Sequence, residues 1–137
     1  YRDNDAFTRL DSREAYIEGY RNQVEYAAVQ IVEIVTEIQN KSPNSIIIIQ
    51  GDHGPGVFYE QENLENSDLD EKAHILNAYF FPDGDYSNIP ENITPVNSFR
   101  VVLNQFFGTD LEILANITYF STYYEPMNFI DVSLRLR

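Results

Sequence analysis

An aspartate and a histidine stand next to each other where a strongly apolar stretch of the sequence ends. Asp52 and His53 follow residues 45–50, which contain four consecutive isoleucines, and glycines flank the pair at Gly51 and Gly54. A carboxylate oxygen and an imidazole nitrogen are ligands that suit zinc or manganese. The residue types therefore make Asp52 and His53 candidate ligands of a divalent cation.

The same pair also has an interpretation without a metal. An aspartate often accepts hydrogen bonds from the backbone of the turn that follows it, and a histidine in a loop needs no ligand. Two ligands also do not complete a zinc site, which takes three or four from the protein. Both interpretations of Asp52 and His53 stay open on spacing alone.

The isoleucine run predicts where in the fold this pair lies. Residues 46–49 have no polar face, and Pro43 and Gly51 bound the run. Such a run predicts a strand that is buried on both sides, as in parallel sheets covered by helices. Ligands of such sheets gather at the carboxyl ends of the strands. Asp52 and His53 come directly after that end.

A long helix is predicted before this strand, over residues 12–41. Apolar residues recur there at steps of three and four: Ile17, Tyr20, Val24, Ala27, Ala28, Ile31, Ile34, Val35 and Ile38. Asp11 or Ser12 is the expected N-cap, and the segment 40–44 contains the polar residues and the proline that end the helix. The continuous apolar stripe predicts packing against the core.

The remaining elements follow the isoleucine strand. Residues 74–81 are predicted to form a second buried strand, and residues 95–107 a helix with Gly108 as its C-cap. A short edge strand is expected at 129–133. Helix followed directly by strand predicts an α/β fold, a partial three-layer αβα sandwich whose sheet is mainly parallel and whose long helix precedes the central strand.

Other residues are weaker candidates for a metal site. His74 opens the second strand and is a candidate third ligand, although an ordinary histidine at the edge of the core is the simpler expectation. The loop at 54–71 carries six acids: Glu60, Glu62, Glu65, Asp68, Asp70 and Glu71. Their spacing is not that of an EF-hand, so a solvated acidic loop is expected in preference to a calcium site.

An aromatic segment lies between the last helix and the edge strand. Residues 109–128 contain Tyr119, Phe120, Tyr123 and Tyr124. These side chains are expected to pack as a small satellite cluster. A platform that faces a sugar or a lipid is the alternative.

Composition excludes some classes of partner. The 137 residues carry a formal net charge of -13, which argues against nucleic-acid binding and against adsorption to anionic lipid. The sequence has no cysteine, so it has no disulfide. No apolar run approaches the roughly 18–20 residues that span a bilayer. We expect no nucleic acid and no direct membrane contact by this segment.

The segment 46–54, with the sequence IIIIQGDHG, resembles the metal-binding strand end of the alkaline phosphatase superfamily. The greater similarity is to its sulfatase-like branch, which includes sulfatases, phosphoethanolamine transferases and lipoteichoic acid synthases. The long helix before the strand and the segment 93–108 are also similar to that branch. The resemblance covers most of residues 12–133, and it implies that Asp52 and His53 hold zinc or manganese, with calcium as a further candidate.

The resemblance also implies a reaction and a missing part. In that branch the cation activates a serine, threonine or formylglycine that attacks the phosphorus or sulfur of an ester. The nucleophile and the other ligands precede the long helix, and no residue of this chain stands at the expected position. Residues 12–137 are therefore expected to be the C-terminal portion of one sulfatase-like domain, inactive by itself, and residues 1–11 a linker or loop.

The start at Tyr1 instead of Met predicts a piece of a longer protein. By resemblance, that protein is a membrane-anchored hydrolase or transferase that acts on phosphate or sulfate esters outside the cytoplasm. A domain that keeps the fold but has lost catalysis is the alternative, and an unrelated flavodoxin-like binding module is a third hypothesis. Self-association is expected through the apolar face that the missing part would cover.

Overall fold

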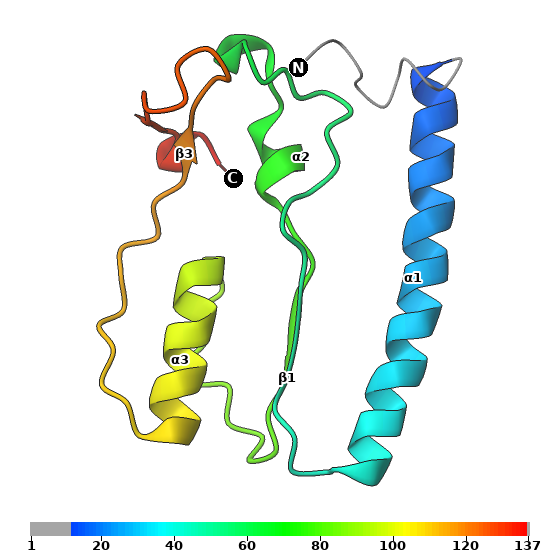
Figure 1. Ribbon diagram of the computed structural model, residues 1–137, viewed down its shortest axis with the longest axis vertical. Coiled ribbons are helices and arrows are strands. Elements are labelled where there is room, and N and C mark those ends of the chain that lie inside the picture. The colour runs from blue at the N-terminus through cyan, green and yellow to red at the C-terminus, as the bar shows by residue number, and fades with distance from the viewer. Residues whose placement is uncertain (1–11, 137) are drawn as a thin grey trace.

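The computed structural model describes residues 12–136, and the predicted linker at 1–11 lies outside the described residues. The elements, in chain order, are α1 (Arg13–Lys41), β1 (Ile47–Gln50), a 3-10 helix (Leu64–Asn66), α2 (Leu69–Ala73), β2 (Asn77–Phe80), α3 (Pro95–Phe107), β3 (Tyr119–Phe120), β4 (Ile130–Asp131) and a second 3-10 helix (Ser133–Arg135). Figure 1 shows α1 and α3 standing on opposite sides of β1 and β2.

The two predicted helices are confirmed. The side chain of Ser12 caps α1 by accepting a hydrogen bond from the N–H of Ala15 at 3.1 Å, whereas Asp11, the other candidate cap, lies outside the described residues. Helix α3 begins at Pro95 and ends before Gly108, whose φ of 67° is left-handed and suits glycine. Among the described residues, no helix is both long enough and apolar enough to cross a bilayer.

The predicted strands are present, but they are only half-buried instead of buried, and their pairing differs from the prediction. β1 and β2 are antiparallel, with Ile47 opposite Phe80 and Gln50 opposite Asn77. The described residues form two antiparallel two-stranded sheets instead of the predicted mainly parallel sheet and three-layer sandwich. The reason lies in the connection after β1. It contains a 3-10 helix of three residues and α2 of five residues, and neither is long enough to form the helical crossover that usually joins parallel strands.

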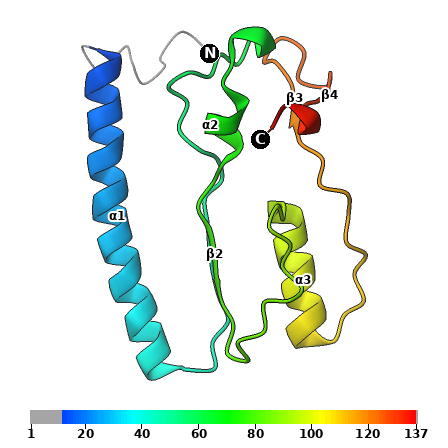
Figure 2. The same ribbon diagram turned by 180° about the vertical axis from the view of Figure 1, so that it is seen from behind.

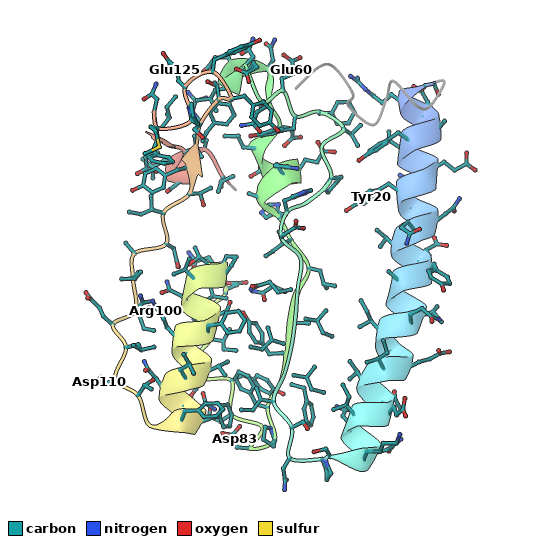
Figure 3. The ribbon with its side chains drawn as sticks, viewed as in Figure 1. Tyr20, Glu60, Asp83, Arg100, Asp110 and Glu125 are labelled. Atoms are coloured by element: carbon teal, nitrogen blue, oxygen red, sulfur yellow. The ribbon has the colours of Figure 1, made fainter. Side chains whose placement is uncertain are left out.

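The two faces of the β1–β2 pair are covered to different degrees. Both views show α1 on one side and α3 on the other (Figures 1 and 2). On the α3 side, Ser98 and Phe81 are buried, whereas α1 contains no buried residue. Tyr20 points from α1 toward the strands (Figure 3), yet its side chain stays exposed. The prediction that the apolar stripe of α1 packs against the core is therefore wrong for the described structure, in which no residue of α1 is buried.

Phe81 is the centre of the packed side. Its ring stacks on Tyr86 at 5.2 Å between centroids and meets Phe106 of α3 edge-on at 5.1 Å. Val101 and Val102 of α3 are buried as well. Aromatic pairs in such arrangements stabilise a core beyond the area that they bury. These contacts attach α3 to the end of β2.

The hydroxyl of Ser98 joins both strands to α3. Ser98 Oγ lies 2.5 Å from the hydroxyl of Tyr79 on β2, and it accepts a hydrogen bond from the Gln50 side chain of β1 at 3.2 Å. Ser98 is fully buried, so water cannot replace these bonds. The polar network therefore fixes how α3 sits on the strand pair.

The chain that follows α3 runs back along the helix without forming a strand. Asn97 donates to the carbonyl of Leu114 at 2.8 Å and accepts from its N–H at 3.0 Å, and Asn104 holds Leu111 in the same way. Seven helical residues rise about 10.5 Å, which matches the roughly 10 Å spanned by three extended residues. Arg100 lies on the same helix and donates to a carbonyl of the same segment at 2.8 Å (Figure 3).

The predicted edge strand at 129–133 is present as β4, and it pairs antiparallel with β3, which the sequence pattern does not predict. Hydrogen bonds from the hydroxyl and N–H of Ser133 hold the pKa of Asp131 below its usual value, and Ser87 does the same for Asp85. Since these pKa values are lowered by folding, their contribution to stability is present above the unfolded pKa. It is lost as the pH falls through the folded pKa.

Removing the Ser98 hydroxyl is expected to destabilise the fold. In Ser98→Ala the side chains of Tyr79 and Gln50 lose a buried partner, which costs about 1–3 kcal/mol. Urea unfolding followed by circular dichroism measures the change. The control is Ser42→Ala at an exposed position, which should stay within about 0.5 kcal/mol of the wild type. Equal stability of both variants would contradict the role given to Ser98.

Candidate functional site

The candidate ligands lie at the carboxyl end of β1. The N–H of Gly51 donates to the carbonyl of Leu76 at 2.9 Å, which extends the β1–β2 pairing by one residue. The chain then leaves the sheet at Asp52. Asp52 and His53 therefore occupy the end of the isoleucine strand, as the sequence predicts.

The two side chains lie close to each other and open to solvent. His53 Nε2 is 3.8 Å from Asp52 Oδ2, and the side chains are 57% and 90% exposed, respectively. Two ligands of a tetrahedral zinc ion lie ~3.4 Å apart, so a small movement brings this pair to a common ion. Asp52 Oδ1 accepts a hydrogen bond from the N–H of His53 at 3.0 Å, which leaves Oδ2 to bind a cation.

The ring of His53 has a second contact that favours one tautomer. Nδ1 lies 2.7 Å from the carbonyl oxygen of Gly54, which can only accept a hydrogen bond. Nδ1 must therefore carry the proton in this contact, and Nε2 keeps its lone pair. Histidines that bind metals usually have their other nitrogen held in this way.

Lys72 also reaches this ring, which the sequence does not predict. Its Nζ lies 3.0 Å from His53 Nδ1 and 5.6 Å from the centre of the Tyr59 ring. Donation from Lys72 needs an unprotonated Nδ1 and puts the proton on Nε2, so it selects the tautomer that cannot bind a cation through Nε2. The shorter contact with Gly54 favours the competent tautomer. Either way, an ammonium group stands beside the pair.

Close packing against α2 fixes this part of the chain. Gly54 is buried, and its N–H donates to the carbonyl of Lys72 at 2.8 Å. A Cβ at position 54 would lie 2.0 Å from the carbonyl oxygen of Glu71, so no other residue fits there without movement. The Glu71 carboxylate accepts the N–H groups of Val57 and Phe58 at 3.0 and 2.8 Å. These bonds hold the loop that carries the pair.

The structure does not bring a third ligand to the pair. His74 is the exposed C-cap of α2. Within residues 12–136, no group of three or more His, Asp, Glu or Cys side chains could hold a metal ion. Asp52 and His53 are thus an open pair of ligands in this part of the chain.

The acids of the loop serve mainly as local acceptors. Asp68 caps α2 by accepting from the N–H of Glu71 at 3.0 Å, and Glu65 pairs with Arg135 at 2.8 Å. A pocket of about 460 Å³ lies among residues 64–70, Phe58 and Arg135. It does not include Asp52 or His53. The acidic loop therefore contributes one structural carboxylate near the site, that of Glu71.

The aromatic segment divides into a packed and an open part. Phe120 is buried and meets Tyr59 edge-on at 6.0 Å, and Tyr119 meets Phe129 at the same distance. Burial raises the pKa of Tyr59, and the neighbouring Tyr123 raises that pKa further. The side chains of Tyr123 and Tyr124 stay exposed. The expected satellite cluster thus forms in part, around Phe120 and next to Tyr59 of the loop that follows β1.

Comparison of the chain with protein-family models, curated proteins and solved structures gives no match. The candidate site is therefore defined by its own geometry and by the sequence pattern around it. That geometry consists of one carboxylate oxygen, one imidazole nitrogen and one ammonium group at the end of an apolar strand.

An alanine at position 54 is expected to disturb both stability and the pair. In Gly54→Ala the new methyl group would meet the backbone of Glu71, and overpacking of this kind costs roughly 1–3 kcal/mol. In the control Gly56→Ala the nearest atom is the mobile Lys72 Nζ at 3.8 Å. Thermal unfolding and the NMR signals of the His53 ring measure the two effects. Similar behaviour of the two variants would contradict the close approach of Gly54 to α2.

Proposed function

We propose that this chain is the C-terminal portion of a sulfatase-like domain, in which Asp52 and His53 are two of the ligands of a divalent cation. The distance of 3.8 Å between His53 Nε2 and Asp52 Oδ2 is the observation that carries the proposal. The contact of Nδ1 with the Gly54 carbonyl supports it, because that contact leaves Nε2 free. The position at the end of the isoleucine strand is the place where such folds bind ligands.

The donor set fits zinc or manganese better than calcium. Imidazole is a good ligand for zinc and carboxylate suits manganese, whereas calcium takes six to eight oxygen ligands. When bound, such a cation lowers the pKa of a nucleophile and neutralises negative charge on an ester. The nucleophile and the other ligands are proposed to lie in a longer polypeptide. With two ligands, the 137-residue chain should bind the cation weakly and have no activity.

The position of Lys72 beside His53 supports the proposal that the substrate is an anion. The chain as a whole has a net charge of -13, which repels phosphate and sulfate esters. An ammonium group 3.0 Å from the His53 ring supplies local positive charge at the site itself. Sulfate or phosphate esters are therefore the substrate class that we propose for the longer protein.

The arrangement of the layers is compatible with the same proposal. α1 and α3 lie on opposite sides of β1 and β2 (Figure 1). We propose that this strand pair is part of a wider, mainly parallel sheet of a three-layer sandwich. The other strands would come from the longer, membrane-anchored polypeptide, with the domain outside the cytoplasm.

A domain without catalysis is the second candidate. The observation in its favour is that residues 12–136 bring no third acid or histidine to Asp52 and His53. Ester hydrolysis by the longer protein that is lost in His53→Gln supports the enzyme. Cation binding with no turnover of any sulfate or phosphate ester supports the second candidate.

Calorimetric titration with zinc or manganese tests the pair. The wild-type chain is expected to bind one cation through these ligands, and Asp52→Asn and His53→Gln should each weaken that binding by roughly tenfold or more. The matched control is His74→Gln, because the chain has only two histidines. His74→Gln should titrate like the wild type. Equal uptake by all of these variants would exclude the pair as ligands.

Removal of the neighbouring positive charge should strengthen cation binding, in contrast to the substitutions of Asp52 and His53. Lys72→Met eliminates a like charge beside the site, so it is expected to raise the affinity for zinc. The same variant should weaken binding of inorganic sulfate or phosphate to the zinc-loaded chain. Unchanged affinities for both ions would show that Lys72 does not act at the site.

A further inference from the structure

β1 has a second edge that is not used in the described structure. The bond from the Gly51 N–H to Leu76 shows that Gly51 faces β2. Backbone direction alternates along a strand, so the N–H and C=O groups of Ile48 and Gln50 point away from β2. Among residues 12–136, these outward groups and those of Ile46 have no backbone partner. They form an open strand edge, called the outer edge of β1 below.

This edge is neither covered nor protected. The strand pair is seen edge-on in both ribbon views, and no other element crosses in front of β1 in Figure 1. Proteins usually protect such edges with charges, prolines or bulges. Residues 44–51 contain no charged residue and no proline. The edge of β2 differs, because the Phe81 N–H donates to the Tyr86 hydroxyl at 3.2 Å and Pro82 follows.

We propose that two copies of the 137-residue chain, in the absence of the strands proposed for the longer polypeptide, pair antiparallel through the outer edge of β1. The proposed register places Ile48 opposite Ile48 of the second copy and Ile46 opposite Gln50. All outward groups of Ile46, Ile48 and Gln50 then find partners, which gives about six hydrogen bonds between the copies. The result is a four-stranded sheet in the order β2, β1, β1, β2.

The register keeps the two faces of the sheet distinct. Gln50 bonds to Ser98 of α3, so Gln50 and Ile48 face α3, and Ile47 and Ile49 face α1. Residues directly opposite each other share a face. Pairing Ile48 with its own copy, and Ile47 with Ile49, places both α1 helices on one side and both α3 helices on the other.

The dimensions of the layers agree with this arrangement. Strands lie about 4.8 Å apart, so two strands present a width close to the roughly 10 Å diameter of one helix. Two α1 helices side by side would therefore cover a four-stranded sheet. Val24 and Ile34, which belong to the apolar stripe of α1, are 49% and 56% exposed and would gain neighbours. The half-buried isoleucines of β1 would lose their remaining contact with water.

The local absence of charge along the outer edge of β1 permits pairing with a second copy, whereas the net charge of the two chains opposes their association. Because residues 44–51 are uncharged, no like charges meet across the paired strands in this register. The two chains nevertheless carry -13 each, or -26 together. Added salt screens this repulsion, with a Debye length of about 10 Å at 0.1 M. The dimer should therefore become tighter as the salt concentration rises, opposite to an interface made of salt bridges.

Sedimentation equilibrium of the 137-residue chain tests the proposal. The wild type is expected to approach twice its mass of 15.9 kDa as concentration and salt increase. Ile46→Lys places a charge at the outer edge and should raise the dimer dissociation constant by roughly tenfold or more. The control is Leu76→Lys, at a 57% exposed position beside β2, and it should dimerise like the wild type. Circular dichroism verifies that each variant is folded.

Amide exchange provides a second measurement that needs no variant. In the dimer the outward N–H groups of Ile48 and Gln50 should be protected from exchange, and dilution should remove that protection. A monomeric wild type at all salt concentrations would overturn the proposal, as would equal weakening by both lysine variants or open-ended assembly. Zinc titration of Ile46→Lys separates this proposal from the proposed function, because the cation site does not depend on the dimer.

Discussion

The buried hydroxyl of Ser98 is the interaction on which the described fold most depends. It joins β1 through Gln50, β2 through Tyr79 and α3 through its own helix. A strand made of isoleucines needs an apolar cover on both faces, and this network determines how one cover is attached. Only the α3 side is closed, since α1 has no buried residue. The open face toward α1 follows from that asymmetry, whereas the outer edge of β1 is open because the sheet has only two strands among the described residues.

The candidate site depends on the same strand pair. β1 delivers Asp52 and His53 to one end of the sheet, and the antiparallel return through α2 brings Lys72 back to them. The absence of a side chain at Gly54 allows the two segments to touch. The placement of Asp52 and His53, the two proposed ligands, beside an ammonium group is thus a product of the pairing of β1 with β2.

Local patterns allowed much of the fold to be predicted, and tertiary contacts account for the rest. The apolar stripe and the cap at Ser12 predict α1, and Pro95 and Gly108 mark the ends of α3. The antiparallel pairing was not predictable, because the sequence pattern does not reveal that the connection after β1 lacks a helix long enough for a crossover. His53 and Lys72 are nineteen residues apart, so no spacing rule connects them. The place of Asp52 and His53 at the end of β1 was predictable because the isoleucine run marks the strand, and their role as ligands stays a prediction.

Nitrogen NMR of the histidine rings during addition of zinc tests the central claim most directly. The account predicts that Nδ1 of His53 carries its proton in the folded chain. It also predicts that Nε2 of His53 shifts on addition of zinc while the ring of His74 does not. A His53 ring protonated at Nε2, or equal shifts of both histidines, would contradict the claim that Asp52 and His53 form a cation site.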